Sequence, residues 1–429
     1  MEENLKEEKN KWEISWRSLV REMKREGIIA GPMVGVAVLQ YLLQVSSLIM
    51  VGHLGHLSIA SVAIAISLTN VTGFSLLSGM AGGLETLCGQ AFGAEQYHKL
   101  GTYTYAAIIS LSLICLPISV LWIFMDKFLF LVGQDPLISI EACHFSMCLI
   151  PGLFASAILK PLTRYCQTQS SILPMLLITL VTCWILIYKF EIGKNGAAIS
   201  ISLSTWVNVM LLGFYVTYSS VFEKTRISFS KEAFQGVGEF YRYAVPSAVM
   251  YIWFMLFRKN NVRIKLANLN LTISTLHFTI SYGVGATTST RVSNELGAGK
   301  PEAARLAVWA AMFIAATEAV TVSISLFLCR SFVGYAFTNE KQVVSYIAIM
   351  APLICLSVFM DSLQAVLSGV ARGSGWQRMG AYINLGAFYV AGLPMGIVLG
   401  FVLHLKGKGL WIGIAIKARE RAISTLAGH

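Results

Sequence analysis

The sequence has little charge. Asp, Glu, Lys and Arg make up 13% of its 429 residues, and hydrophobic residues make up 55%. Soluble globular proteins usually carry about 25% charged residues. The charged side chains are also clustered, and several stretches contain none: 27–84, 100–125, 142–159, 165–188, 195–222, 266–290 and 379–405. This distribution excludes an ordinary soluble domain and predicts a membrane protein.

The lengths of these stretches predict membrane-spanning helices. A spanning helix needs roughly 20 apolar residues at a rise of 1.5 Å per residue, so the first stretch is long enough for two crossings. Two further stretches, 306–329 and 342–371, are each interrupted by a single acid, Glu318 and Asp361. A shorter stretch, 243–257, also lacks charge. The apolar runs are continuous rather than alternating, which favours helices over a barrel and predicts about eleven crossings.

The sequence also lacks the motifs of metal sites and of membrane enzymes. Its eight cysteines form no CxxC pair and lie in or beside apolar stretches, so we expect free, buried thiols. It has neither paired acids at short spacing nor His-rich boxes. We therefore expect no metal, no other cofactor and no enzymatic activity. A lipid flippase remains an alternative, and a channel is disfavoured because no pore-loop signature is present.

The net charge of +11 does not indicate a nucleic-acid ligand, because the basic residues lie in the short connections. With the N-terminus in the cytoplasm, the expected inner segments are 1–26 and the loops near 85–99, 160–164, 223–242, 291–305 and 372–378. These segments hold 19 Lys and Arg, against 11 in the expected outer loops. This asymmetry follows the positive-inside rule and predicts the orientation.

The two halves of the chain resemble each other. The segment 90-QAFGA-94 resembles 294-NELGA-298, and each joins one apolar stretch to the next. Pro32 and Pro246 open the first helix of each half, and Pro151 and Pro352 lie in the fourth. Transporter folds are often built from two such repeats. We therefore predict an all-α polytopic membrane protein with two six-helix lobes.

This repeat predicts the domain boundaries. The fifth helix of the first lobe and the seventh helix, at 243–257, are expected to be short, and the twelfth to be lacking. The N-terminal segment has Trp16, Val20 and Met23 at helical spacing, which is typical of a helix at the cytoplasmic membrane surface or of a solvated helix. The predicted segments are the amphipathic cytoplasmic N-terminus 1–26, the first lobe 27–222, the cytoplasmic linker 223–242, the second lobe 243–416 and the tail 417–429.

Several long motifs resemble one family. They are 51-VGHLG-55, 84-LETLCGQAFGA-94, 289-STRVSNELGAG-299 and 366-VLSGVARGSGWQ-377. In their order they are similar to the signatures of the multidrug and toxic compound extrusion (MATE) family, in its plant branch, over about residues 28–415. The resemblance implies two six-helix lobes around a central cavity. It also implies a secondary antiporter that exports organic compounds such as alkaloids, flavonoids, other xenobiotics or organic cations in exchange for protons.

The sequence departs from that family in its seventh helix. There the family usually carries a glutamate that takes part in cation coupling, whereas 250-MYIWFMLF-257 has no acid and is followed by Arg258 and Lys259. A non-transporting truncated or splice form therefore stands as the alternative function.

Two intramembrane acids are the candidate coupling residues. An acid at membrane depth is costly when ionised, so desolvation favours uptake and release of a proton. Asp361 lies in the charge-free run between Lys341 and Arg372, at the position that matches the family's tenth-helix aspartate. Glu318 is central in its helix. The alternatives are a pair between Asp361 and a nearby arginine, and a structural hydrogen bond for Glu318.

Two further groups of polar residues complete the candidate site. At the inner face we expect gate or packing residues, with Glu85 and Glu295 paired to Arg291, Lys99 or Arg305. Amides and a phenol in the spans either line the cavity or join helices. The gate candidates are Glu85, Arg291, Asn294, Glu295 and Arg372. The cavity candidates are Gln40, Gln44, Asn70, Asn208, Asn270, Tyr282 and Asn384.

The expected partners are a small organic molecule, protons and the lipid bilayer, with no nucleic acid. We expect a monomer in the plasma membrane or the vacuolar membrane.

Overall fold

A computed structural model of the chain describes residues 15–52, 56–180, 194–226, 231–259, 265–333 and 341–386, with 394 and 398. All of its long elements are helices. The helices of the first half are α2 (Trp16–Gly52), α3 (His56–Thr69), the π-helical turn η1 (Asn70–Phe74), α4 (Ser75–Ala81), α5 (Gly83–Gly93), α6 (Tyr97–Ile123), α7 (Met125–Leu131), α8 (Pro136–Thr168) and α10 (Lys194–Tyr218).

The second half is helical in the same way. After the 3-10 turn η2 (Ser220–Phe222), which ends the first half, its helices are α11 (Glu232–Gln235), α12 (Val237–Lys259), α13 (Lys265–Gly297), α14 (Pro301–Leu328), α15 (Arg330–Val333), α16 (Lys341–Gly373) and α17 (Gln377–Gly386).

Local sequence signals set several of these boundaries. Asp135 caps α8, because its carboxylate accepts the backbone N–H of Leu137 at 2.8 Å, and Pro136 occupies the first turn. Gly299 lies between α13 and α14 with a φ of 69°. That left-handed conformation is readily adopted by glycine, and it allows the chain to turn between two antiparallel helices.

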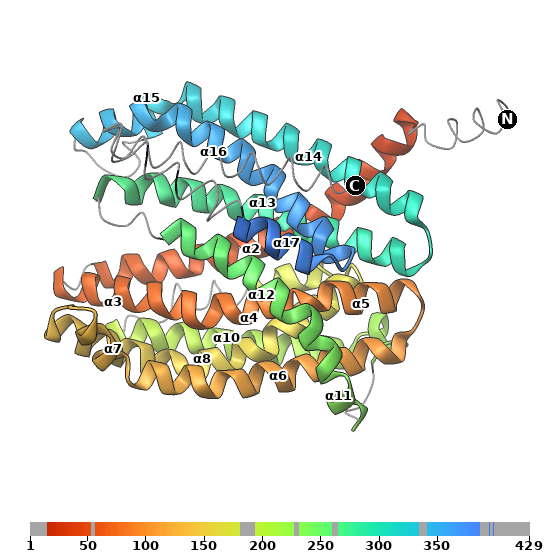
Figure 1. Cartoon of the computed structure of the whole chain (residues 1–429), viewed down its shortest axis with the longest axis horizontal. Coiled ribbons are helices and arrows are strands. Elements are labelled where there is room, and N and C mark those ends of the chain that lie inside the picture. The colour runs from red at the N-terminus through yellow and green to blue at the C-terminus, as the bar shows by residue number, and fades with distance from the viewer. Residues whose placement is uncertain are drawn as a thin grey trace.

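The helices form two lobes that lie one above the other in Figure 1. One lobe contains α3, α4, α6, α8 and α10, and the other contains α13, α14 and α16. Two helices join them, because α2 packs against α13 and α14 while α12 packs against α4 and α5. The first helix of each half therefore contacts the other half.

The outer surface of the bundle is apolar. Among the described residues, six helical stretches are long and apolar enough to cross a membrane: Ser61–Gly93, Tyr97–Ile123, Pro136–Thr168, Ala198–Tyr218, Pro301–Leu328 and Ala348–Gly373. Large apolar side chains such as Leu113, Val120, Met210 and Phe214 are exposed on α6 and α10. An extended apolar surface of this kind is suited to contact with lipid.

Several boundaries differ from the prediction. The expected inner loop at 160–164 is wrong, since α8 continues to Thr168. Five residues between two apolar runs are easily accommodated in one long helix whose charged side chains turn inward. The helix α12 takes in charged residues before its apolar window and reaches 23 residues. The segment Trp16–Glu26 is continuous with the first span in α2.

The prediction that all cysteines are buried is also wrong, because Cys329 is exposed at the end of α14. The described cysteines are free thiols. The part of the fifth helix beyond residue 180 and the C-terminal segment, where the twelfth helix is predicted to be lacking, fall outside the residues that the structure describes.

Candidate functional site

A buried ion-pair cluster joins the two lobes. Glu85, in the first turn of α5, pairs with Arg164 of α8 and with Arg372 of α16. The Arg164 Nη1 atom lies 2.8 Å from Glu85 Oε1, and Arg372 Nε donates to Glu85 Oε2 at 2.7 Å. The three side chains are 1%, 8% and 7% exposed. Because Arg372 comes from the other lobe, this pair can exist only while the lobes are in contact here. We call Glu85, Arg164 and Arg372 the gate cluster.

The gate cluster contains two arginine cations and one glutamate anion, and neighbouring polar groups accept hydrogen bonds from the arginines. Arg164 donates to the hydroxyl of Tyr282 and, at 2.6 Å, to Gln167 Oε1. The guanidinium groups of Arg164 and Arg372 lie 5.9 and 5.8 Å from the centroid of the Tyr282 ring. An aromatic face attracts cations. A buried charge is tolerated only when it is paired and hydrogen-bonded, so these contacts stabilise the closed arrangement.

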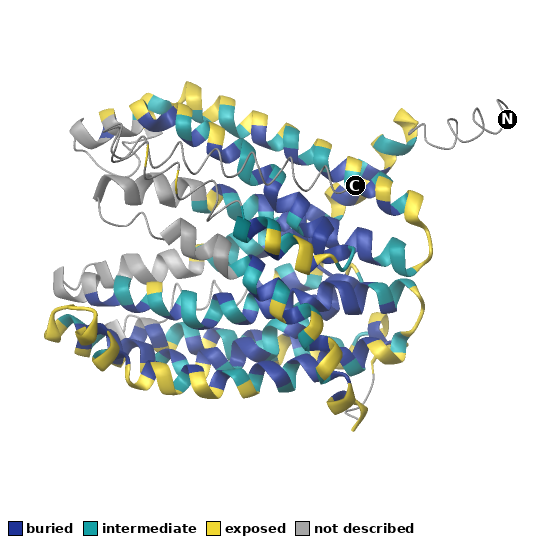
Figure 2. Cartoon of the chain, viewed as in Figure 1, coloured by how far each residue is buried: buried dark blue, intermediate teal, exposed yellow. Residues whose placement is uncertain are grey.

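Backbone contacts between α5 and α13 close the same end of the bundle. A Cβ atom at Gly93 would lie 2.0 Å from the carbonyl oxygen of Asn294, and one at Gly297 would lie 2.3 Å from that of Gln90. Only glycine allows helices to approach this closely. Asn294 also donates to the carbonyl of Thr168 at 3.0 Å. Figure 2 shows buried residues at α5 and at this end of α13, as well as within α6 and α8 of the first lobe.

A second ionic cluster lies where α2 meets the same end of α13. Arg291 donates to Glu22 Oε1 through Nε at 2.9 Å and through Nη2 at 2.6 Å. Glu295 lies 2.8 Å from Arg291 Nη2 and 3.8 Å from Arg25 Nη1. Glu26, just before the charge-free span, is 2% exposed. Burial and the neighbouring charge of Glu22 raise the pKa of its carboxyl to about 8, against the opposing effect of Arg291.

The gate residues predicted from the sequence therefore fall into two groups. Glu85 and Arg372 belong to the gate cluster, while Arg291 and Glu295 pair beside α2. The expected pairing of Glu295 with Arg291 is confirmed. The expected pairing of Glu85 with Arg291, Lys99 or Arg305 is wrong, because Arg164 and Arg372 occupy both oxygens of its carboxylate.

A third polar cluster lies inside the second lobe, where α13, α14 and α16 meet. Oε1 of Glu318 is 3.0 Å from Nε2 of His277. Ser362 donates its hydroxyl to Oε2 of Glu318 at 2.8 Å and lies 3.2 Å from Nε2 of His277. Ser281 completes the group at 3.1 Å from Ser362. The side chains of His277 and Glu318 are 3% and 18% exposed.

The other coupling candidate, Asp361, is half-buried in α16 immediately before Ser362. It takes part in an interaction of its own. Arg372, one of the arginines that could have paired with Asp361, is bound to Glu85. Asp361 on α16 and Glu318 on α14 lie on two helices of the second lobe that pack against each other.

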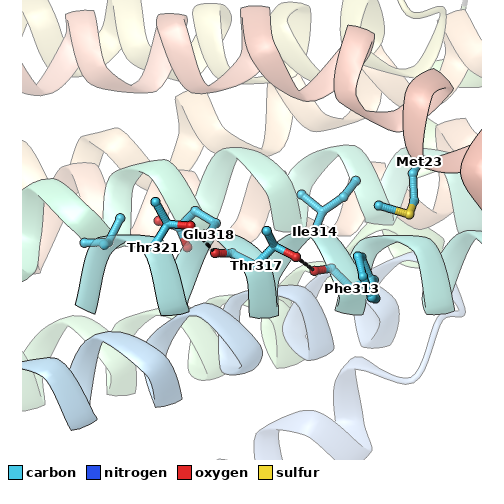
Figure 3. Close-up of a pocket in the computed structure, with 7 residues that line it drawn as sticks. Met23, Phe313, Ile314, Thr317, Glu318 and Thr321 are labelled. Carbon is cyan, nitrogen blue, oxygen red and sulfur yellow. Dashed lines mark hydrogen bonds between the residues drawn. The ribbon is translucent and has the colours of Figure 1, made fainter. Parts of the chain in front are cut away.

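A cavity of about 390 Å³ opens between the start of α2 and α14. Figure 3 shows Glu318, Thr317 and Thr321 on the α14 side and Met23 on the α2 side. Each threonine hydroxyl donates to the backbone of its own helix, at 2.8 Å. Glu318 adds a carboxylate to the lining, and its oxygens contact His277 and Ser362 on the inner side of α14. The full lining is Met23, Phe313, Ile314, Thr317, Glu318, Thr321 and Val322.

The predicted cavity residues are spread through the fold. Tyr282 belongs to the surroundings of the gate cluster. Asn384 is buried in α17 and lies within 3.5 Å of the Met250 carbonyl and of Gln364. Tyr282 and Asn384 therefore each join neighbouring helices. Asn208 is buried, Gln40 and Asn70 are half-buried, and Gln44 and Asn270 lie outside the residues whose side chains are described.

Two important residues escaped the sequence analysis. Arg164 was assigned to a loop, although only five residues separate the apolar runs on its two sides. His277 was not predicted because the charge-free stretches were defined by the absence of Asp, Glu, Lys and Arg, and histidine does not interrupt them. Its position near the middle of the charge-free stretch 266–290 was the available signal.

The fold and these clusters define a class: a multi-pass integral membrane protein whose two helical lobes meet at a buried ion-pair cluster. The MatE family profile matches residues 32–188 and 264–398. Protein DETOXIFICATION 6 of Arabidopsis thaliana is 47% identical over 95% of this chain and 89% of its own length. Protein DETOXIFICATION 12 of the same plant is 47% identical over 92% of this chain and 86% of its own. The chain thus belongs to the MatE family and is a membrane efflux transporter.

Solved structures agree with this assignment. The crystal structure of the eukaryotic MATE transporter AtDTX14 matches with a TM-score of 0.88 and 45% identity, over 96% of each chain. An outward-facing MATE family transporter matches with a TM-score of 0.79 at 18% identity, over 97% of each chain, which shows a shared fold.

Proposed function

We propose that this transporter exports small organic compounds in exchange for protons, by alternating access between its two lobes. The observation that carries the proposal is the location of Asp361 and Glu318 on two packed helices of one lobe, in stretches otherwise free of charge. An ionisable group at membrane depth marks an ion or proton pathway by default, because its charge is costly there.

The gate cluster supplies the conformational part of the mechanism. In the arrangement described here the gate cluster is intact and buried, which corresponds to a closed inner face. Opening that face separates Arg372 from Glu85. Protonation in the second lobe and binding of cargo then bias the same equilibrium in opposite directions, which is the requirement for coupled exchange.

The experiment that tests this proposal is transport by the purified protein in lipid vesicles. With a proton gradient imposed, the protein is expected to move ethidium, a fluorescent organic cation, against its concentration gradient. Asp361→Asn and Glu318→Gln are expected to abolish gradient-driven transport. Glu302→Gln, an exposed acid in the first turn of α14, serves as the control and is expected to transport normally.

Two results would overturn the proposal. Wild-type protein that leaves ethidium and a panel of neutral organic compounds at equilibrium under a proton gradient would favour a non-transporting form. Undiminished gradient-driven transport by both variants would remove these acids from the mechanism. We further propose a monomer in the plasma membrane or the vacuolar membrane, which size measurement in lipid nanodiscs and a fluorescent fusion in plant cells would test.

A further inference from the structure

The cavity between α2 and α14 follows the axis of one helix. Its α14 side extends from Phe313 to Val322. Nine residues of α-helix rise about 14 Å, which is close to the depth of one leaflet in a hydrocarbon core of about 30 Å. The cavity therefore has a length that suits one lipid acyl chain lying along the helix.

The polar side chains of the described lining are satisfied inside the protein. The hydroxyls of Thr317 and Thr321 donate to the backbone of α14 at 2.8 Å. The carboxylate oxygens of Glu318 contact His277 and Ser362. The other lining residues are apolar, and they are Met23, Phe313, Ile314 and Val322. A ligand in this cavity gains mainly apolar contacts, which a hydrocarbon chain provides and a hydrated ion does not.

A row of cations lies on the start of α2. Arg17, Arg21 and Lys24 are exposed, and their spacing of four and three residues places them on one face of the helix. Among the described residues, these three side chains make no ion pair. The acids of the same segment turn inward, since Glu22 and Glu26 are only 9% and 2% exposed. The outward face of this segment is therefore positively charged. We call Arg17, Arg21 and Lys24 the cationic face.

The cationic face adjoins one end of the cavity. Trp16, Val20 and Met23 each come directly before one of the three cations, so an apolar face lies beside the cationic face. The centroid of the Trp16 ring lies 6.1 Å from that of Phe313. Figure 3 shows Met23 and Phe313 at one end of the row of lining residues and Thr321 at the other. The cations are therefore next to the Met23 end of the cavity.

The predicted orientation places this end of the cavity at the cytoplasmic leaflet, because α2 begins on the cytoplasmic side. That leaflet carries anionic phospholipids, which attract Lys and Arg side chains next to the membrane. A phospholipid whose chain enters the cavity from the Met23 end brings its phosphate close to the cationic face. The charge and the shape of the site therefore complement the same molecule.

We propose that the cavity between α2 and α14, together with the cationic face, binds one anionic phospholipid of the cytoplasmic leaflet. One acyl chain fills the cavity, and the phosphate pairs with the cations. Because the lipid contacts both helices, it holds the start of α2 against the second lobe. This inference goes beyond the proposed function and does not depend on it, since lipid binding is measured without transport.

The test measures lipid binding to the purified protein by native mass spectrometry. It compares two probes with identical chains, dioleoylphosphatidylserine and dioleoylphosphatidylcholine. The wild type is expected to bind the first phosphatidylserine at least tenfold more tightly, because the phosphatidylcholine headgroup has no net charge. A combined variant that removes the cationic face is expected to lose this preference. Its substitutions are Arg17→Gln, Arg21→Gln and Lys24→Gln.

A matched control separates this site from the total charge of the inner face. It removes three exposed cations from other segments that are predicted to lie on the same side, and it is expected to keep the preference within twofold of the wild type. Its substitutions are Lys99→Gln, Lys224→Gln and Lys231→Gln.

The apolar part of the site is tested by filling the cavity. Thr317→Phe adds a ring to the lining and is expected to weaken phosphatidylserine binding at least tenfold, although the cations remain. Val320→Phe is the control, because Val320 is exposed on α14 and is not part of the described lining. It is expected to bind phosphatidylserine within twofold of the wild type. If Thr317→Phe does not fold, the charge variants decide the test.

Several results would overturn the inference. Equal affinity of the wild type for the two lipids, or an equal loss of preference in the two charge variants, removes the cationic face from the site. Equal phosphatidylserine binding by Thr317→Phe and Val320→Phe shows that no chain fills the cavity. Displacement of phosphatidylserine by ethidium would assign the cavity to cargo, and a dimer that excludes the lipid would assign it to a second copy of the chain. Either result contradicts the proposed occupant.

Discussion

Replacing Glu85 by glutamine tests whether the gate cluster holds the inner face closed. Glutamine has nearly the same shape, so the perturbation is the loss of one negative charge between Arg164 and Arg372. Both arginines are more than nine-tenths buried, and Glu85 contacts each within 2.8 Å. The substitution leaves two buried cations facing each other across the lobes.

The size of the effect follows from the burial. Removing one partner of a buried ion pair costs about 3–5 kcal/mol, because the other charge stays desolvated. The penalty applies mainly to the closed gate, since opening separates Arg372 from the first lobe and lets water reach both arginines. A cost of about 3–5 kcal/mol corresponds to a shift of roughly 150- to 5,000-fold in the equilibrium between closed and open gates.

Cysteine labelling can measure this shift. Thr290 is 3% exposed and accepts a hydrogen bond from Gln167 across the lobes, at 2.8 Å. In a background without the native cysteines, Thr290→Cys should react slowly with a membrane-impermeant maleimide from the cytoplasmic side. Adding Glu85→Gln is expected to raise the labelling rate at least tenfold. Adding Glu302→Gln is the matched control and should not change it.

Two labelling results would refute this reasoning. Folding of Glu85→Gln is judged by an unchanged elution profile and an unchanged thermal transition in detergent. If the variant folds and Thr290→Cys is still labelled as slowly as without the substitution, the gate cluster does not control opening. A faster rate from both sides of the membrane would indicate general loosening instead, and would also contradict the account.

Two further predictions concern the same end of the molecule. Burial raises the pKa of Glu26 from 4.5 to about 8, so its contribution to stability is full below pH 4.5 and is lost as the pH rises through 8. The loss of stability is at most about 5 kcal/mol. Glu26→Gln should abolish the decline of the thermal midpoint between pH 6 and pH 9. A decline equal to that of the wild type would show that deprotonation of Glu26 does not cause it. Gly93→Ala places a methyl group against the Asn294 carbonyl and should increase gate opening at least tenfold in the labelling assay, whereas Gly238→Ala, with open space around it, should not. Equal labelling in the two variants would show that close approach at Gly93 is not required.

Much of the fold could be predicted from where charge is absent. Charge-free runs longer than a bilayer crossing admit few arrangements, so α6, α14 and α16 fall close to their predicted ranges. Charged residues that are buried within a helix bundle are wrongly predicted to lie in loops when helices are inferred from the absence of charge. Arg164 was assigned to a loop because Lys160 and Arg164 separate two charge-free runs. In the structure Glu85 pairs with Arg164 and Gln167 accepts a hydrogen bond from it inside the bundle.

The sequence predicted several residues of the candidate site, but it did not predict which of them contact each other. Glu318 stood out as a lone acid in an apolar helix, but its partner His277 lies 41 positions earlier in the sequence. Such a contact depends on how α13 and α14 pack, which periodicity alone does not specify. The partners of Glu85 were mispredicted for the same reason. Arg291, Lys99 and Arg305 were expected at the same inner face, whereas the packing brings Arg164 and Arg372 to Glu85.

Proton release on cargo binding tests the central claim most directly. When ethidium is added to the purified wild-type protein in weakly buffered detergent solution near neutral pH, linkage requires protons to leave as the cation binds. The account predicts a release that approaches about one proton per bound ethidium at pH values where the site is mostly protonated, and none in Glu318→Gln. Saturable binding of ethidium to the wild type with no proton release at any pH between 5 and 9 would contradict it.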